Sequence, residues 1–120
     1  MFAAATRGFA FAEGPTLPEP APAASDASAK LVLAGNAAFS NGDLRAASSD
    51  YRAALRRTPG SGIAVFNLGL VEMHEGRATS GTRDMDRGIA LAKQNGASPR
   101  ELSKLRALRA AFSHPRAELT

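Results

Sequence analysis

The amino-acid sequence predicts an all-α fold: a right-handed stack of two antiparallel helical hairpins plus a C-terminal helix, behind a disordered N-terminal tail. The first observation is a repeat, because Gly35 and Gly69 are separated by 34 residues, as are Gly42 and Gly76. Apolar residues also recur at helical spacing between breaks that contain glycine or proline. No segment shows the alternation expected of a strand. A fixed period of this length is typical of stacked helical hairpins.

The composition fits one small domain and excludes several classes of site. The chain has 120 residues, of which 44% are hydrophobic, and no cysteine. It therefore has no disulfide framework and no thiolate metal site. No run approaches the roughly 20 apolar residues that span a bilayer, so we expect no transmembrane segment. The formal net charge is +4. The basic residues are dispersed and no aromatic residues interleave with them, which favours solvated helix faces over a nucleic-acid surface.

Residues 1–25 are interpreted as a disordered tail rich in proline and alanine. Pro15, Pro18, Pro20 and Pro22 prevent a continuous helix there. Ala10-Phe11-Ala12 has the small-x-small form of a signal-peptidase site, but Arg7 interrupts the short apolar run before it. A degenerate export signal therefore remains an alternative. We expect a cytoplasmic location by default, with an exported or periplasmic one as the alternative.

The helical domain is expected over residues 26–115, with a short tail at 116–120. Asp26 is a candidate cap for a helix over about 27–40, and Gly42 supplies the left-handed residue that ends it. Asp43 then caps a helix over about 44–57, which Pro59-Gly60 ends.

A second hairpin follows with the same spacing. Ser61 opens a helix over about 62–75 that Gly76 stops, and the next helix covers about 78–94 and ends at Asn95-Gly96. Gly81 and Gly88 lie inside that helix, where each costs about 1 kcal/mol relative to alanine. We expect a close contact between helices to offset this cost.

The last helix has the clearest start. Ser98, Pro99 and Glu101 form a capping box with proline at the first helical position. Leu102, Leu105, Leu108 and Phe112 form its apolar stripe, and Pro115 stops it.

Residues 28–95 resemble two tetratricopeptide repeats. The matching residues in the first copy are Leu31, Ala34-Gly35, Gly42-Asp43, Ala47, Tyr51, Ala54 and Pro59. In the second copy they are Val65, Leu68-Gly69, Gly76, Gly81, Met85 and Gly88. Three positions depart from the family pattern: Ala38 and Glu72 stand where an aromatic residue is usual, and Lys93 replaces the closing proline. The helix after residue 98 resembles the solvating helix that often ends such arrays.

The resemblance implies that the first helix of each hairpin lines a concave face. Its positions there are Ala29, Val32, Asn36, Phe39, Ile63, Phe66, Leu70 and Met73. The apolar stripe from Ile63 to Met73 is explained in two ways. It either packs on the terminal helix or on the N-terminal tail, or it forms an open groove for a peptide or helix of a partner. Phe2, Phe9 and Phe11 of the tail are candidate occupants of the same groove.

Some family members also hold a peptide carboxylate with asparagine and basic side chains. Asn36 and Asn67 fall on the two asparagine positions, and Arg100 and Lys104 fall on the basic ones. Val32 stands where the first lysine is expected, so one charge-assisted bond is missing. Asn67 also suits a structural role, as a hydrogen bond between helices.

The predicted function is a scaffold or adaptor that binds a protein or peptide partner in this concave groove, and homo-oligomers are possible in principle. The alternative is a basic surface for nucleic acid or an acidic partner, made by Arg100, Lys104, Arg106 and Arg109. We expect no enzyme activity, no catalytic residues, no cofactor and no metal ion. His74 and His114 are the only histidines, and a histidine near a helix end more often interacts with the helix dipole.

Overall fold

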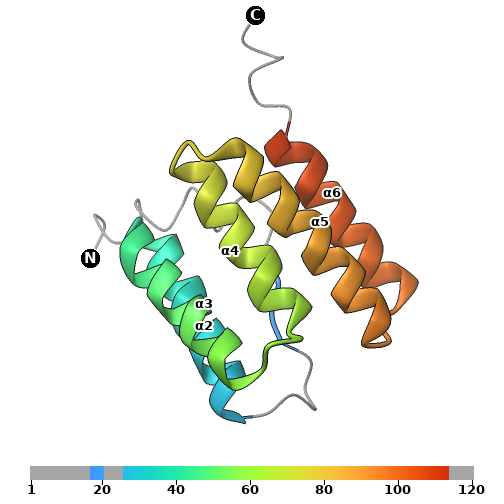
Figure 1. The fold of residues 1–120 in the computed structure, drawn as a ribbon, viewed down its shortest axis with the longest axis horizontal. Helices are drawn as coiled ribbons and strands as arrows, with labels where there is room; N and C mark the ends of the chain where they lie inside the picture. Colours follow the sequence, from blue (N-terminus) through green and yellow to red (C-terminus); the bar gives the residue numbers. More distant parts are fainter. Residues whose placement is uncertain (1–16, 21–25, 114–120) are drawn as a thin grey trace, which may run out of the picture.

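The computed structural model describes residues 17–20 and 26–113, and it contains five helices in that part of the chain. They are α2 (Asp26–Ser40), α3 (Leu44–Arg57), α4 (Gly62–His74), α5 (Ala78–Gln94) and α6 (Pro99–Ser113). Consecutive helices run antiparallel, and α4 lies between the α2–α3 hairpin and the α5–α6 pair (Figure 1). The all-α prediction and its five helices are confirmed, with bounds within two residues of those expected. Asp26 belongs to α2 itself.

The two hairpins turn in the same way, which confirms the repeat at atomic level. Gly42 and Gly76 have positive φ values of 81° and 85°. After the first glycine, the Asp43 amide donates to the Ala38 carbonyl at 2.9 Å. After the second, the Arg77 amide donates to the Glu72 carbonyl at the same distance. This is the hydrogen bond of a glycine-terminated helix end, formed twice with a 34-residue offset.

Short-range caps fix the beginnings of three helices. The Ala46 amide donates to Asp43 Oδ1 at 3.0 Å, and the Ala64 amide donates to Ser61 Oγ at 3.2 Å. At α6 the capping box is complete in both directions. The Glu101 amide donates to Ser98 Oγ, while the Ser98 amide donates to Glu101 Oε1. These helix starts were predicted because each depends on residues that are close in sequence.

Glycines bring α4 and α5 into direct backbone contact. A Cβ atom added at Gly69 would lie 2.7 Å from the Gly81 carbonyl oxygen, and one at Gly88 would lie 2.7 Å from the Gly62 carbonyl oxygen. The two crossing pairs are therefore Gly69 with Gly81, and Gly62 with Gly88. The expected close approach is confirmed, and it explains why glycine stands inside a helix at Gly81 and Gly88.

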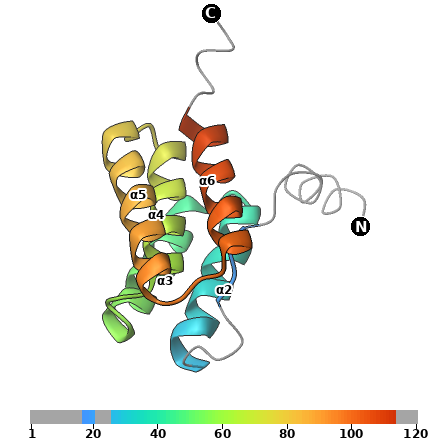
Figure 2. The same cartoon turned by 90° about the vertical axis from the view of Figure 1, so that its right-hand side faces the viewer.

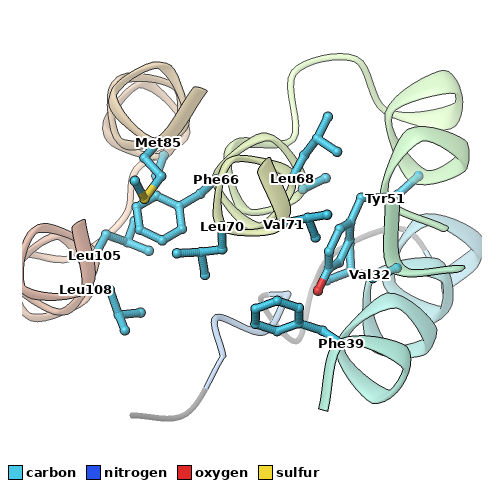
Figure 3. Close-up of a cluster of buried hydrophobic side chains, with 14 of the residues drawn as sticks. Val32, Phe39, Tyr51, Phe66, Leu68, Leu70, Val71, Met85, Leu105 and Leu108 are labelled. Carbon is cyan, nitrogen blue, oxygen red and sulfur yellow. The ribbon is translucent and has the colours of Figure 1, made fainter. Parts of the chain in front are cut away.

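The core extends along both sides of α4. Leu68 and Val71 point toward α3, where Tyr51 is fully buried, whereas Phe66 and Leu70 point toward α5 and α6 (Figure 3). Leu105 and Leu108 of α6 complete that second side. Because α3 covers one side of α4 and α6 covers the other, both sides of this helix carry apolar residues.

Candidate functional site

A cleft of about 950 Å³ opens where α2, the start of α4, the end of α5 and α6 converge. Part of its wall is the segment Leu17–Pro20, which runs between α2 and α6 (Figure 2). Its apolar lining includes Val32, Ile63, Leu105 and Leu108, and its polar lining includes Ser28, Thr58, Asn95 and Lys104. A mainly apolar cleft with a few polar groups has the usual form of a ligand-binding pocket.

Two asparagine side chains bind the main chain of this segment. Asn36 Nδ2, from α2, and Asn67 Nδ2, from α4, each donate to the Pro18 carbonyl oxygen at 3.0 Å. Asn67 Nδ2 also lies 3.0 Å from Asn36 Oδ1. One backbone carbonyl therefore receives two hydrogen bonds from two repeats. We call Asn36 and Asn67 the amide pair.

Tyr51 orients the amide pair from the core. Its hydroxyl donates to Asn36 Oδ1 at 2.5 Å, so the nitrogen of that amide is the atom left to face Pro18. Burial raises the pKa of Tyr51, a hydrogen bond from Asn67 lowers it, and the charge of Asp50 raises it. The hydroxyl thus keeps its proton and remains a donor. In Figure 3 its oxygen points toward the space that the N-terminal segment enters.

Gly35 makes room for the tyrosine ring. A Cβ atom at Gly35 would lie 2.5 Å from Tyr51 Cε1. The equivalent position in the second repeat, Gly69, faces Met85 and Gly81 instead. The same glycine position of the repeat therefore has two roles. Gly35 makes room for the tyrosine that orients the amide pair, and Gly69 allows α4 and α5 to pack closely.

The concave positions named from sequence divide into two groups. Four of them line the cleft, namely Ala29, Val32, Ile63 and Lys104, and Asn36 and Asn67 lie beside it at Pro18. The others form a buried or half-buried set, made of Phe39, Phe66, Leu70 and Met73. Arg100 is exposed and is not among the cleft-lining residues.

The middle of the apolar stripe of α4 packs against α6, as in the first of its two explanations, whereas Ile63 at its start lines the cleft. Phe66 and Leu70 have no exposed surface and pack with α6, so they do not form an open groove. At the other end, Phe39 lies 4.9 Å from His74, and Phe112 lies 5.2 Å from it, measured between ring centroids. His74 Nδ1 is 3.1 Å from the Leu70 carbonyl. This ring contact gives His74 a structural role at the end of α4.

The sequence did not single out Leu17 and Pro18, which the structure places against the helices. They belong to the tail that was expected to be disordered, yet Leu17 packs on the core and Pro18 meets the amide pair. The proposed plug residues Phe2, Phe9 and Phe11 lie outside the described residues. The signal in the sequence that could have indicated this contact is the pair of asparagines at matching concave positions. Their side-chain N–H groups need hydrogen-bond acceptors when they are buried.

The charged residues of the described part include one acid pair, the buried Glu72 with the half-buried Asp84, and two surface ion pairs, Arg77 with Glu75 and Arg109 with Asp86. Glu72 is 5% exposed. Burial, a hydrogen bond with Asp84 and the charge of Asp84 together raise its pKa to about 7, against the lowering effects of Arg77 and Arg52. Among the described residues no group of three His, Asp or Glu side chains is placed to hold a metal ion. Arg109 binds Asp86 through two nitrogens, at 2.6 and 3.1 Å.

The comparisons with known proteins give one match. The model of the tetratricopeptide repeat matches residues 32–81, which begin within α2 and end within α5. The resemblance to the tetratricopeptide repeat that the sequence predicted is therefore confirmed over residues 32–81. The five helices are consistent with two such repeats and an additional helix. The comparisons with curated proteins and with solved structures found no match.

A tetratricopeptide repeat domain is generally a protein–protein interaction module and is typically non-catalytic. The repeat therefore suggests protein partners. Within the described residues, the longest apolar helical stretch is too short or too polar to cross a bilayer.

Proposed function

We propose that this chain is an adaptor that binds a peptide segment of a partner protein on the concave side of its repeats, in the cleft between α2, α4 and α6. The observation that carries the proposal is the contact at Pro18. Two side-chain amides, one from each repeat, already bind an extended main chain there. Because they recognise a carbonyl group, they suit many peptide sequences.

The cleft beside Pro18 supplies the second part of the recognition surface. Ile63 offers half-buried apolar surface, Val32 lies beneath it with 1% exposed, and Lys104 adds an exposed positive charge. We propose these residues, with Asn36 and Asn67, as the partner-binding set. Arg100 is one turn from Lys104 on α6 and is the outermost candidate.

A bulky residue introduced at the cleft tests this function without removing any buried side chain. Ala107 lines the cleft and is exposed, so Ala107→Trp fills the opening from α6. Ala110→Trp is the matched control, because Ala110 is exposed on the same helix and is not among the cleft-lining residues. Peptides are first selected from a random display library on the full chain, and their affinities are then measured by fluorescence anisotropy.

The expected result is a loss of at least about tenfold in affinity for Ala107→Trp and none for Ala110→Trp, which corresponds to about 1.4 kcal/mol. Equal affinities for both variants and the unaltered chain would place the binding surface elsewhere. Selected peptides whose affinity falls by orders of magnitude between low and moderate salt would instead support the basic-surface alternative.

A further inference from the structure

The segment Leu17–Pro20 has the features of a bound peptide ligand. Its four residues form no helix, and none of them is fully buried. The hydrogen bonds that fix it come from side chains of the helices to its backbone, at the carbonyl of Pro18. Because both hydrogen bonds end on a main-chain carbonyl, an extended segment of another sequence can make the same contact.

The sequence of the segment lowers the cost of holding it extended. Pro18 and Pro20 restrict their own φ angles and disfavour the helical region at Leu17 and Glu19. Proline-containing segments lose little conformational entropy on binding, which is why several recognition domains use them. Leu17, directly before Pro18, packs on the core cluster and supplies the apolar anchor.

The amide pair is oriented before any partner arrives. Tyr51 holds Asn36 through a partly buried hydrogen bond, and Asn67 donates to both Asn36 and Pro18. Asn67 Oδ1 is buried and makes no hydrogen bond within the described residues. The segment thus accepts one hydrogen bond from the Asn67 amide nitrogen, Asn36 Oδ1 accepts another, and the Asn67 acceptor stays unused.

We infer that Leu17–Pro20 is an internal ligand that occupies the site, and that the partner is an extended segment with an apolar residue followed by proline, whose proline carbonyl replaces that of Pro18. This inference rests on the proposed function and adds the partner's chemistry and a means of regulation. Binding requires the internal segment to leave. Five residues join Pro20 to Asp26, and a tether this short presents its ligand at an effective concentration on the order of millimolar.

The test uses the full chain and a synthetic peptide with the sequence of residues 13–22. Leu17→Asp places a charge at the apolar anchor, which releases the internal segment. Leu33→Asp is the matched control, because Leu33 is the large hydrophobic residue exposed on α2, at 46%, and it does not line the cleft. Affinity is measured by anisotropy, and the side-chain amide signals of Asn36 and Asn67 are followed by NMR.

The peptide is expected to bind the Leu17→Asp chain about tenfold more tightly than the unaltered chain or the Leu33→Asp chain. The two asparagine amide signals should shift in Leu17→Asp and return when the peptide is added. A peptide with aspartate in place of its leucine should bind none of the three chains.

A different pattern would overturn the inference. If the Leu17→Asp chain stays folded by circular dichroism and does not bind the peptide, or binds it no better than the control does, the segment is not a ligand. If Leu17→Asp unfolds the chain, the segment is a structural part of the fold and the inference also fails. Neither result alters the outcome for Ala107→Trp, so the proposed function is tested separately.

Discussion

The buried carboxyl group of Glu72 makes the stability of this domain depend on pH in a direction that can be worked out. Its pKa rises from an ordinary value of 4.5 to about 7, first because of burial and then because of Asp84. In the folded chain the neutral form of the Glu72 carboxyl is therefore favoured up to about pH 7. The contribution of this group to the free energy of unfolding is highest below pH 4.5, where both states carry the proton, and it is lost as the pH rises from 4.5 through 7.

The magnitude follows from the size of the shift. The change from 4.5 to about 7 corresponds to about 3 kcal/mol in total, of which about 2 kcal/mol is lost between pH 5 and pH 8. Glutamine at position 72 resembles the neutral acid in shape and does not titrate. Glu72→Gln should therefore be more stable than the unaltered chain by about 3 kcal/mol at pH 8 and by only about 1 kcal/mol at pH 5.

The assay is urea denaturation of both chains at pH 5 and pH 8, because the difference between the two chains cancels the titrating groups that do not interact with Glu72. Glu75→Gln is the control. It carries the same chemical change one turn away, on an exposed residue whose surface ion pair with Arg77 contributes less than about 1 kcal/mol. A Glu72→Gln chain that is no more stable than the unaltered chain at pH 8 would refute the reasoning.

Two further predictions concern packing and capping. Gly69→Ala places a methyl group 2.7 Å from the Gly81 carbonyl, and the overpacking should outweigh the gain in helix propensity, for a net loss of about 2 kcal/mol in unfolding free energy. Gly60→Ala has no atom within 4 Å of the added carbon, so a similar loss there would contradict this explanation. Ser98→Ala removes the acceptor for the Glu101 amide and should cost about 1 kcal/mol in urea denaturation. Ser103→Ala, on an exposed position inside α6, should leave the midpoint within the error, and equal losses at both serines would exclude a capping effect.

Only part of the site could be predicted from the sequence, and the residues show why. Asn36 and Asn67 were recognised as concave candidates because the repeat places them at equivalent faces of two helices. Their observed ligand, the carbonyl of Pro18, lies 18 residues before one and 49 before the other. Its position depends on the packed shape of both hairpins, and no local pattern encodes that. Phe66 and Leu70 illustrate the same limit, because their pattern fits an open groove as well as a covered one.

The sequence by itself determined the helices, their ends and the repeat. Caps such as Ser98 with Glu101, and turns such as that at Gly42, depend on groups a few residues apart, so their energetics are local. The glycines at the crossing of α4 and α5 are also readable, since only a close approach offsets their cost inside a helix.

The tertiary structure alone decided which surfaces stay open. Docking of α6 buries one apolar side of α4, and the approach of α2 to α4 brings two amides to a single carbonyl of the N-terminal segment. Burial and long-range hydrogen bonding depend on the simultaneous placement of segments distant in sequence. For that reason the occupant of the concave surface became visible only in the folded chain.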